Sequence, residues 1–70
     1  MSSKRDRFKR LAEQRTNAIL RKIKILGNCS NRSAYEYTEE EISKIFATIE
    51  KMVKETKSKF HFPMRNQFKL

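Results

Sequence analysis

The sequence predicts an all-α protein built as an antiparallel hairpin of two helices. Two segments, 4–26 and 39–60, carry apolar residues at helical spacing. A long polar connection over 27–38 separates them, and a short apolar tail over 61–70 follows. Seventy residues suffice for one domain, so we expect a single helical domain that spans the whole chain, 1–70.

The first segment has a recognisable signal at each end. Ser3 is placed to cap the helix through its hydroxyl, with Asp6 as a weaker partner in a capping box. Gly27 follows the last periodic residue, where a glycine in the left-handed conformation would end the helix. The apolar residues between these ends share one helical face: Phe8, Leu11, Ala12, Ile19, Ile23 and Leu26.

The second segment has the stronger start signal. Thr38 and Glu41 have the spacing of a capping box, and Tyr37 and Ile42 flank it as a hydrophobic staple. Glutamates in the first turn also suit the positive end of the helix dipole. A nearly continuous stripe then predicts a helix to about Phe60, and its members are Ile42, Ile45, Phe46, Ile49, Met52, Val53, Thr56 and Phe60.

The connection is longer than most links between helices, which have about 2–8 residues. It predicts one helical turn around Asn31–Tyr35, with Ser30 as its cap. After the second helix, Pro63 prevents a simple helical continuation into the tail. The apolar tail then either packs on its own hairpin or contacts a partner.

A two-helix chain has a thin core, because a domain of this size buries only about 60% of its unfolded surface. We therefore expect that two copies can associate into a four-helix bundle. Leu20 and Ile25 lie off the first apolar stripe and are candidates for that contact. Arg15 falls inside the stripe, where it either pairs with Glu50 or lies at an open edge and contacts a ligand.

The net charge of +9 is concentrated in the first half of the chain. Residues 1–35 carry ten basic and two acidic side chains, a net charge of +8, whereas residues 36–60 carry a net charge of −1. A basic excess confined to one region is typical of an electrostatic footprint for nucleic acid.

The face of the first helix opposite its apolar stripe is basic and amide-rich. It can contact phosphates, and in a major groove arginine can read guanine while Asn or Gln reads adenine. A plain solvated face is the alternative, although such faces usually mix charge signs. The face has Arg7 beside it and Glu13 at its edge, and its members are Arg10, Gln14, Asn17, Arg21 and Lys24.

The connection adds a second set of candidate binding residues. Asn28, Asn31 and Arg32 can donate hydrogen bonds to phosphates or bases, and Tyr35 is a candidate for stacking on an unpaired base. The simpler interpretation is that the Asn and Ser side chains of the connection satisfy the local backbone.

No pattern indicates catalysis, a cofactor or a metal. Cys29, the only cysteine, has no neighbouring base that could activate it as a nucleophile. A metal site needs three or four ligands, and His61 has no cluster of such residues near it in the sequence. No apolar run of about 18 residues predicts a transmembrane helix. The basic first helix lacks tryptophan and has a matching apolar stripe in the second helix, which disfavours a membrane surface. We expect a cytoplasmic protein that is not an enzyme.

Two functions fit this sequence. The first is non-enzymatic binding of nucleic acid, DNA or RNA, through the first helix and the connection. The alternative is a small accessory or inhibitory subunit that binds a larger protein or ribonucleoprotein machine through its basic helix and apolar tail.

Overall fold

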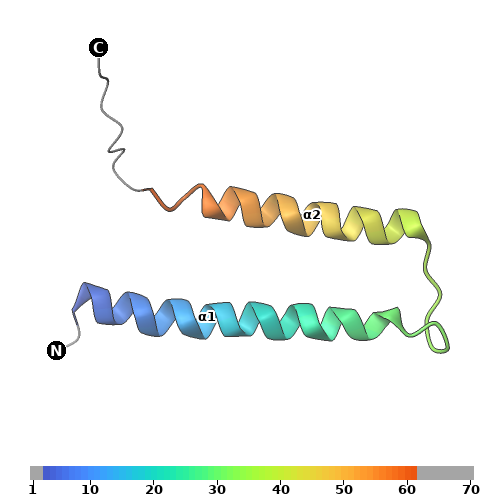
Figure 1. The fold of residues 1–70 in the computed structure, drawn as a ribbon, viewed down its shortest axis with the longest axis horizontal. Helices are drawn as coiled ribbons and strands as arrows, with labels where there is room; N and C mark the ends of the chain where they lie inside the picture. The colour runs from blue at the N-terminus through green and yellow to red at the C-terminus, as the bar shows by residue number, and fades with distance from the viewer. Residues whose placement is uncertain (1–2, 62–70) are drawn as a thin grey trace, which may run out of the picture. The chain divides into compact units, whose positions relative to one another are not determined.

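The computed structural model describes residues 3–61, and within that range it contains helices and turns but no strand. α1 spans Lys4–Gly27, the short 3-10 helix η1 spans Asn28–Ser30, and α2 spans Glu39–Lys57 (Figure 1). The all-α class and the two long helices are therefore confirmed. The chain divides into two units, Met1–Glu36 and Tyr37–Leu70, and each is described by itself. The antiparallel pairing, the single domain, the Arg15–Glu50 ion pair and the four-helix bundle stay predictions.

α1 begins at the predicted cap. Ser3 has an extended backbone (φ −73°, ψ 171°), and its Oγ accepts a hydrogen bond from the Asp6 N–H at 3.0 Å. The Ser3 carbonyl also accepts from the Arg7 N–H at 3.0 Å. The bond to Asp6 satisfies one of the backbone donors that the first turn leaves without an internal partner, and the bond from Arg7 is the first regular helical bond. α1 then continues for 24 residues, a length of about 36 Å.

Gly27 does not end α1 in the way its sequence position predicts. Its backbone is right-handed (φ −59°, ψ −25°) and belongs to the helix, and no described residue has a positive φ. The chain continues through Asn28, also right-handed, into the single turn of η1. The prediction of a left-handed Gly27 was wrong because glycine accepts both conformations, and a tightened last turn is another way to end a helix.

The turn predicted around Asn31–Tyr35 is present, but its cap is Asn31 rather than Ser30. The Asn31 backbone is extended, and its carbonyl accepts from the N–H groups of Ala34 at 3.1 Å and Tyr35 at 2.9 Å. Its side-chain Oδ1 accepts from the Ser33 N–H at 3.0 Å. Asparagine commonly bonds the backbone two residues ahead in this way.

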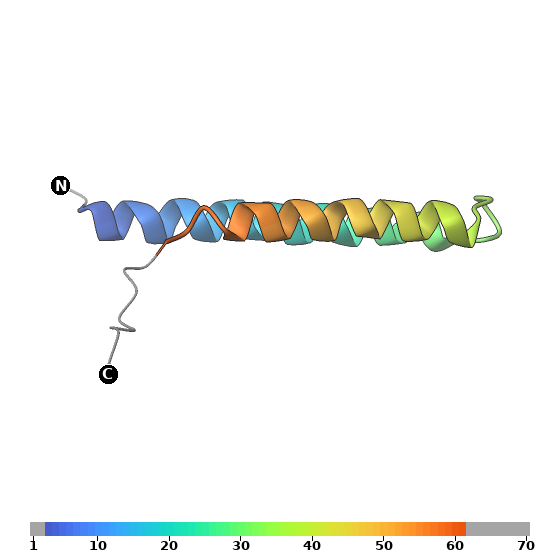
Figure 2. The same ribbon diagram turned by 90° about the horizontal axis from the view of Figure 1, so that it is seen from above.

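The first turn of α2 confirms the capping box. Thr38 Oγ1 accepts from the Glu41 N–H at 3.1 Å, and the Thr38 N–H donates to Glu41 Oε1 at 2.9 Å. Tyr37 and Ile42 are half-buried while most of their neighbours are exposed, which agrees with the predicted staple. The two views of Figure 1 and Figure 2 show α2 as an unbroken coil from this start.

α2 ends at Lys57, about one turn before the predicted Phe60. The N–H groups of Lys59 and Phe60 donate to carbonyls only three residues back, those of Thr56 and Lys57, both at 3.1 Å. The hydroxyl of Ser58 donates to the Glu55 carbonyl at 2.6 Å. A serine that bonds nearby backbone competes with helix continuation, and this explains the earlier end.

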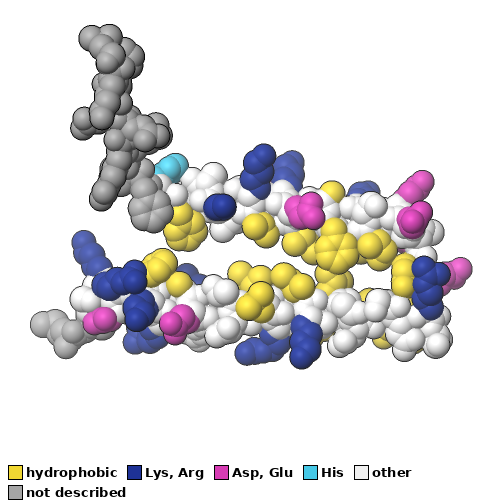
Figure 3. Space-filling view, viewed as in Figure 1, with side chains coloured by type: hydrophobic (Ala, Val, Ile, Leu, Met, Phe, Trp, Pro, Cys, Tyr) yellow, Lys and Arg dark blue, Asp and Glu magenta, His cyan; other side chains and the backbone are white. Residues whose placement is uncertain are grey.

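No described residue is buried, so the apolar stripes retain much of their solvent exposure. Figure 3 shows the hydrophobic side chains of α2 along one side of that helix. Met52 is 61% exposed and Val53 57% exposed, which is unusual for apolar residues of a helical stripe. Of the predicted tail, residues 62–70 lie outside the described range. The half-buried residues are Leu11, Ala12, Leu26, Tyr37, Ile42 and Ile49.

Candidate nucleic-acid interface

The predicted outer face of the first helix lies on one uninterrupted helix, α1. At about 100° per residue its five members fall within an arc of roughly 80°. All five side chains are exposed, as is that of Arg7 beside them. We call these residues the polar stripe, and they are Arg10, Gln14, Asn17, Arg21 and Lys24.

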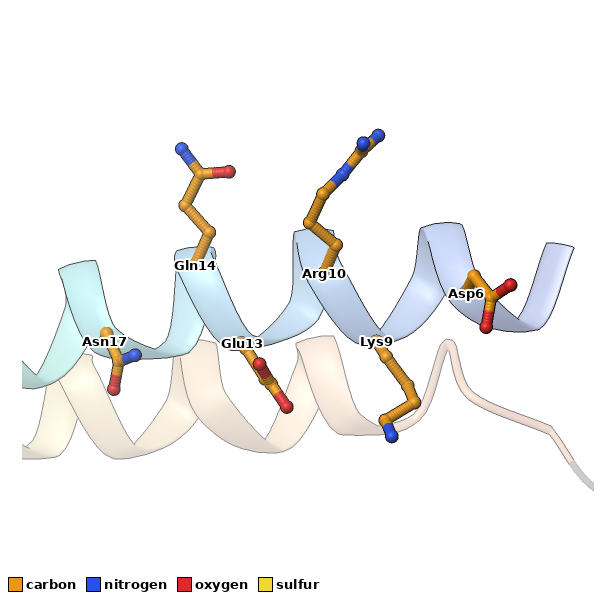
Figure 4. A pocket seen from close by; sticks show the side chains of 6 residues that line it. All are labelled: Asp6, Lys9, Arg10, Glu13, Gln14 and Asn17. Atoms are coloured by element: carbon orange, nitrogen blue, oxygen red, sulfur yellow. The ribbon is translucent and has the colours of Figure 1, made fainter. Parts of the chain in front are cut away.

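The N-terminal half of the polar stripe borders a shallow, open hollow on the surface of α1 (Figure 4). Arg10 and Gln14 extend in the same direction from the helix, whereas Lys9 and Glu13 extend from another side. The residues that line the hollow are Asp6, Lys9, Arg10, Glu13, Gln14 and Asn17.

The hollow contains charges of both signs. Asp6 and Glu13 are its carboxylates, and Lys9 and Arg10 are its cations. Lys9 was not predicted as a site residue, and its spacing of four residues before Glu13 is the signal that could have indicated it. This end of α1 is therefore less favourable to an anionic ligand than the acid-free end, because its carboxylates oppose the attraction of the cations.

The right-handed Gly27 adds a sixth member to the polar stripe. A left-handed residue would have turned the chain away from the helix axis after Leu26. Because the backbone stays right-handed through Asn28, Asn28 follows Lys24 at the helical spacing of four residues and lies in the same arc. The side chain of Asn28 is exposed. The structure thus brings one of the four predicted residues of the connection into line with α1.

The remaining connection residues lie past η1, beyond the helical register of the polar stripe. Asn31 uses its side-chain oxygen to hold the local turn, which supports the interpretation that this asparagine is structural. Arg32 and Tyr35 are exposed on or next to that turn, and Tyr35 is 54% exposed. A stacking role for Tyr35 stays a prediction, as does a binding role for Arg32.

Two further features of the described residues concern metal binding and the membrane. No three His, Cys, Asp or Glu side chains within residues 3–61 are grouped in a way that could hold a metal ion. Neither α1 nor α2 contains an apolar stretch long enough to cross a lipid bilayer. The arrangement that stands out is the row of exposed cations and amides along α1.

No protein family, curated protein or solved structure matches this chain. The chemistry of its exposed side chains is therefore what bears on its function. Guanidinium, ammonium and carboxamide groups on one helical face can donate hydrogen bonds to phosphate oxygens, and the amides can also accept from a base edge.

Proposed function

We propose that this protein binds nucleic acid without catalysing a reaction, and that the polar stripe of α1 is the contact surface. The observation that carries the proposal is the composition of this stripe, which has six exposed members including Asn28 and no carboxylate among them. The proposal implies a cytoplasmic location, where nucleic acid is accessible and Cys29 stays a free thiol.

The polar face of α2 provides an internal comparison. It carries charges of both signs, and Glu40–Lys44, Glu50–Lys54 and Lys51–Glu55 have the four-residue spacing at which opposite charges support an exposed helix. Charges with such partners are accounted for by solvation and helix stability. In the polar stripe Arg10 follows Asp6 at this spacing, but Arg21 and Lys24 have no acidic residue three or four positions away. A ligand of opposite charge accounts better for these two cations.

The test is a titration of the full chain with nucleic acid over a range of salt concentrations. Binding is expected at about 50 mM salt and should fall steeply as salt rises, because each neutralised phosphate releases counterions. The logarithm of the affinity should drop with the logarithm of the salt concentration by about 0.9 for each phosphate contacted on duplex DNA. A chain that binds neither DNA nor RNA at low salt contradicts the proposal.

A pair of double variants tests the face itself. Changing Arg10 and Arg21 to Ala should weaken binding severalfold, because two cations that face the ligand are lost. Changing Lys44 and Lys51 to Ala removes the same charge from the mixed face of α2 and should have a much smaller effect. Equal losses in the two double variants would indicate that net charge alone, rather than the polar stripe, governs binding.

The alternative function is that of a small subunit of a larger assembly, and the exposed apolar stripe of α2 favours it. Ile45, Phe46, Met52 and Val53 lie on that stripe and are all exposed. Apolar surface of this kind commonly marks a protein contact. Such a subunit could bind its partner through this stripe while α1 binds an anionic groove.

Recovery of partners from the source cells, with and without nuclease, separates the two functions. A stoichiometric protein that stays bound after nuclease treatment supports the subunit function. Loss of every partner on nuclease treatment supports direct binding of nucleic acid.

A further inference from the structure

The polar stripe is not uniform along α1. Its N-terminal half lies beside Asp6 and Glu13 in the shallow hollow, but no acidic residue occurs between Glu13 and Glu36. Five cations lie in that acid-free stretch of the sequence, namely Arg15, Arg21, Lys22, Lys24 and Arg32. The cationic side chains of the C-terminal half of α1 therefore attract a polyanion without an opposing carboxylate beside them.

Four members of the polar stripe lie in this half: Asn17, which also lines the end of the hollow, Arg21, Lys24 and Asn28. Helical geometry places them within an arc of roughly 60° and over an axial length of about 16 Å. At about 3.4 Å of duplex axis per base pair, that length corresponds to roughly five base pairs. The row is narrow enough to lie along the floor of a groove of about 12 Å.

The row places two cations between two amides. Phosphate oxygens accept hydrogen bonds only, so a surface for phosphates alone needs donors and gains nothing from the acceptor of an amide. An amide matches adenine, which presents a donor and an acceptor side by side in the major groove, and arginine matches the two acceptors of guanine. A row in which Asn17 and Asn28 flank Arg21 and Lys24 therefore matches the edges of bases better than it matches phosphates alone.

We infer that the C-terminal half of α1 enters the major groove of B-form duplex DNA, with Asn17, Arg21, Lys24 and Asn28 directed to the base edges. This inference rests on the proposed nucleic-acid function and narrows it to one ligand. Duplex RNA fits poorly because its major groove is too deep and narrow for side chains to read. Unpaired strands fit poorly because the row has no aromatic side chain for a base to stack on.

The decisive measurement compares the affinity of the full chain for four short probes of matched sequence. The probes are duplex DNA, duplex RNA, single-stranded DNA and single-stranded RNA. Duplex DNA should bind tightest, by about tenfold or more. Equal or tighter binding of any other probe overturns the inference but leaves nucleic-acid binding intact. Failure to bind all four overturns the proposed function itself.

Two lysines provide a matched pair of variants. Lys24 lies in the row, whereas Lys22 lies roughly 130° from its centre around the helix, and both are exposed. Lys24→Gln should weaken binding to duplex DNA by about fivefold or more, because a contact to a base edge is lost, and Lys22→Gln should leave the affinity nearly unchanged. Equal effects of the two changes, or a larger effect at Lys22, would contradict the placement of the groove-facing row.

The amides are tested on a sequence selected from random duplex DNA. Asn17→Ala and Asn28→Ala should each weaken binding to the selected sequence by about five- to a hundredfold, with little change on random DNA or in the salt dependence. Alanine favours the helix more than asparagine does, so these variants should keep their helicity in circular dichroism. If selection enriches no sequence, or if each variant binds the selected DNA as the parent does, the amides do not read bases.

Discussion

Gly27 is the residue whose conformation most affects the proposed interface. Its right-handed backbone keeps Asn28 on the helical path of α1, and so extends the polar stripe by one turn. A methyl group added at Gly27 would meet no atom within 4 Å. Neither backbone geometry nor crowding therefore requires a glycine at this position.

Replacing Gly27 with Ala should stabilise the chain by about 0.5–1 kcal/mol. The expected gain comes from the lower conformational freedom of alanine in the unfolded chain, with no strain in a right-handed helix. Urea denaturation followed by circular dichroism, at one protein concentration, measures the change. A loss of stability would instead indicate that Gly27 needs a conformation that alanine cannot adopt.

Residues that cap helices were predictable from the sequence where their partners lie close along the chain. Ser3 and Thr38 each bond the backbone three residues ahead, so a short sequence window contains the whole interaction. The cap of the intervening turn was assigned to Ser30 instead of Asn31, because both residue types bond local backbone and several candidates adjoin one another. Local chemistry thus identified the turn but not which side chain caps it.

At the level of the helix, α1 and α2 have different reasons for their polar residues. Those of α2 are largely explained by its capping box, its dipole and its pairs of opposite charge. In the polar stripe of α1, Lys24 suits the helix dipole and Arg10 follows Asp6 at a favourable spacing. Arg21 and the amides have no comparable local role. The helical period was enough to predict this face, but it contained no information on the ligand, since one face can serve phosphates, bases or an acidic protein.

The capping box of α2 can be tested with two threonines in the same helix region. Thr38→Ala should destabilise the chain by about 1 kcal/mol because the Glu41 N–H loses its acceptor. Thr48 Oγ1 donates to the Lys44 carbonyl at 2.8 Å inside α2, and alanine is a better helix former than threonine. Thr48→Ala should therefore leave stability unchanged or slightly higher in the same urea titration. Equal losses at the two positions would argue against a specific role of the cap.

The ends of the helices were less predictable than their starts. The start of α2 depends on one reciprocal pair, Thr38 and Glu41, which the sequence shows directly. Its end depends on a balance between continued α-helical bonds and the shorter bonds made around Ser58. Such alternatives differ by little free energy. The apolar stripe continues to Phe60 and therefore predicted a longer helix, although α2 ends at Lys57.

At the scale of the whole molecule, the described residues lack a buried core, and this bears on association. The apolar stripe of α2 retains Phe46 at 44% exposure and Ile45 at 38%. Burial of apolar area is the main favourable contribution to folding and association. A chain with this much apolar surface should therefore gain stability from a partner surface, including one on a second copy of itself.

We expect the purified chain to associate into a dimer. Light scattering should give a mass of about twice 8.4 kDa, as a four-helix bundle of two copies requires. Phe46→Glu would introduce a charge into the apolar stripe and should shift the mass toward that of one chain. A mass of one chain for the parent protein at high concentration would mean that its apolar surface serves a different partner or folds back on the chain itself.

The exposed thiol of Cys29 on η1 has a practical consequence for these questions. It is the only cysteine in the sequence, and it immediately follows Asn28 at the end of the polar stripe. A strand-cleaving chelate attached to that sulfur would cut nearby nucleotides and so report where the end of α1 lies and which way the helix points. The native chain thus already carries a unique chemical handle for footprinting, at the end of the surface that most needs to be mapped.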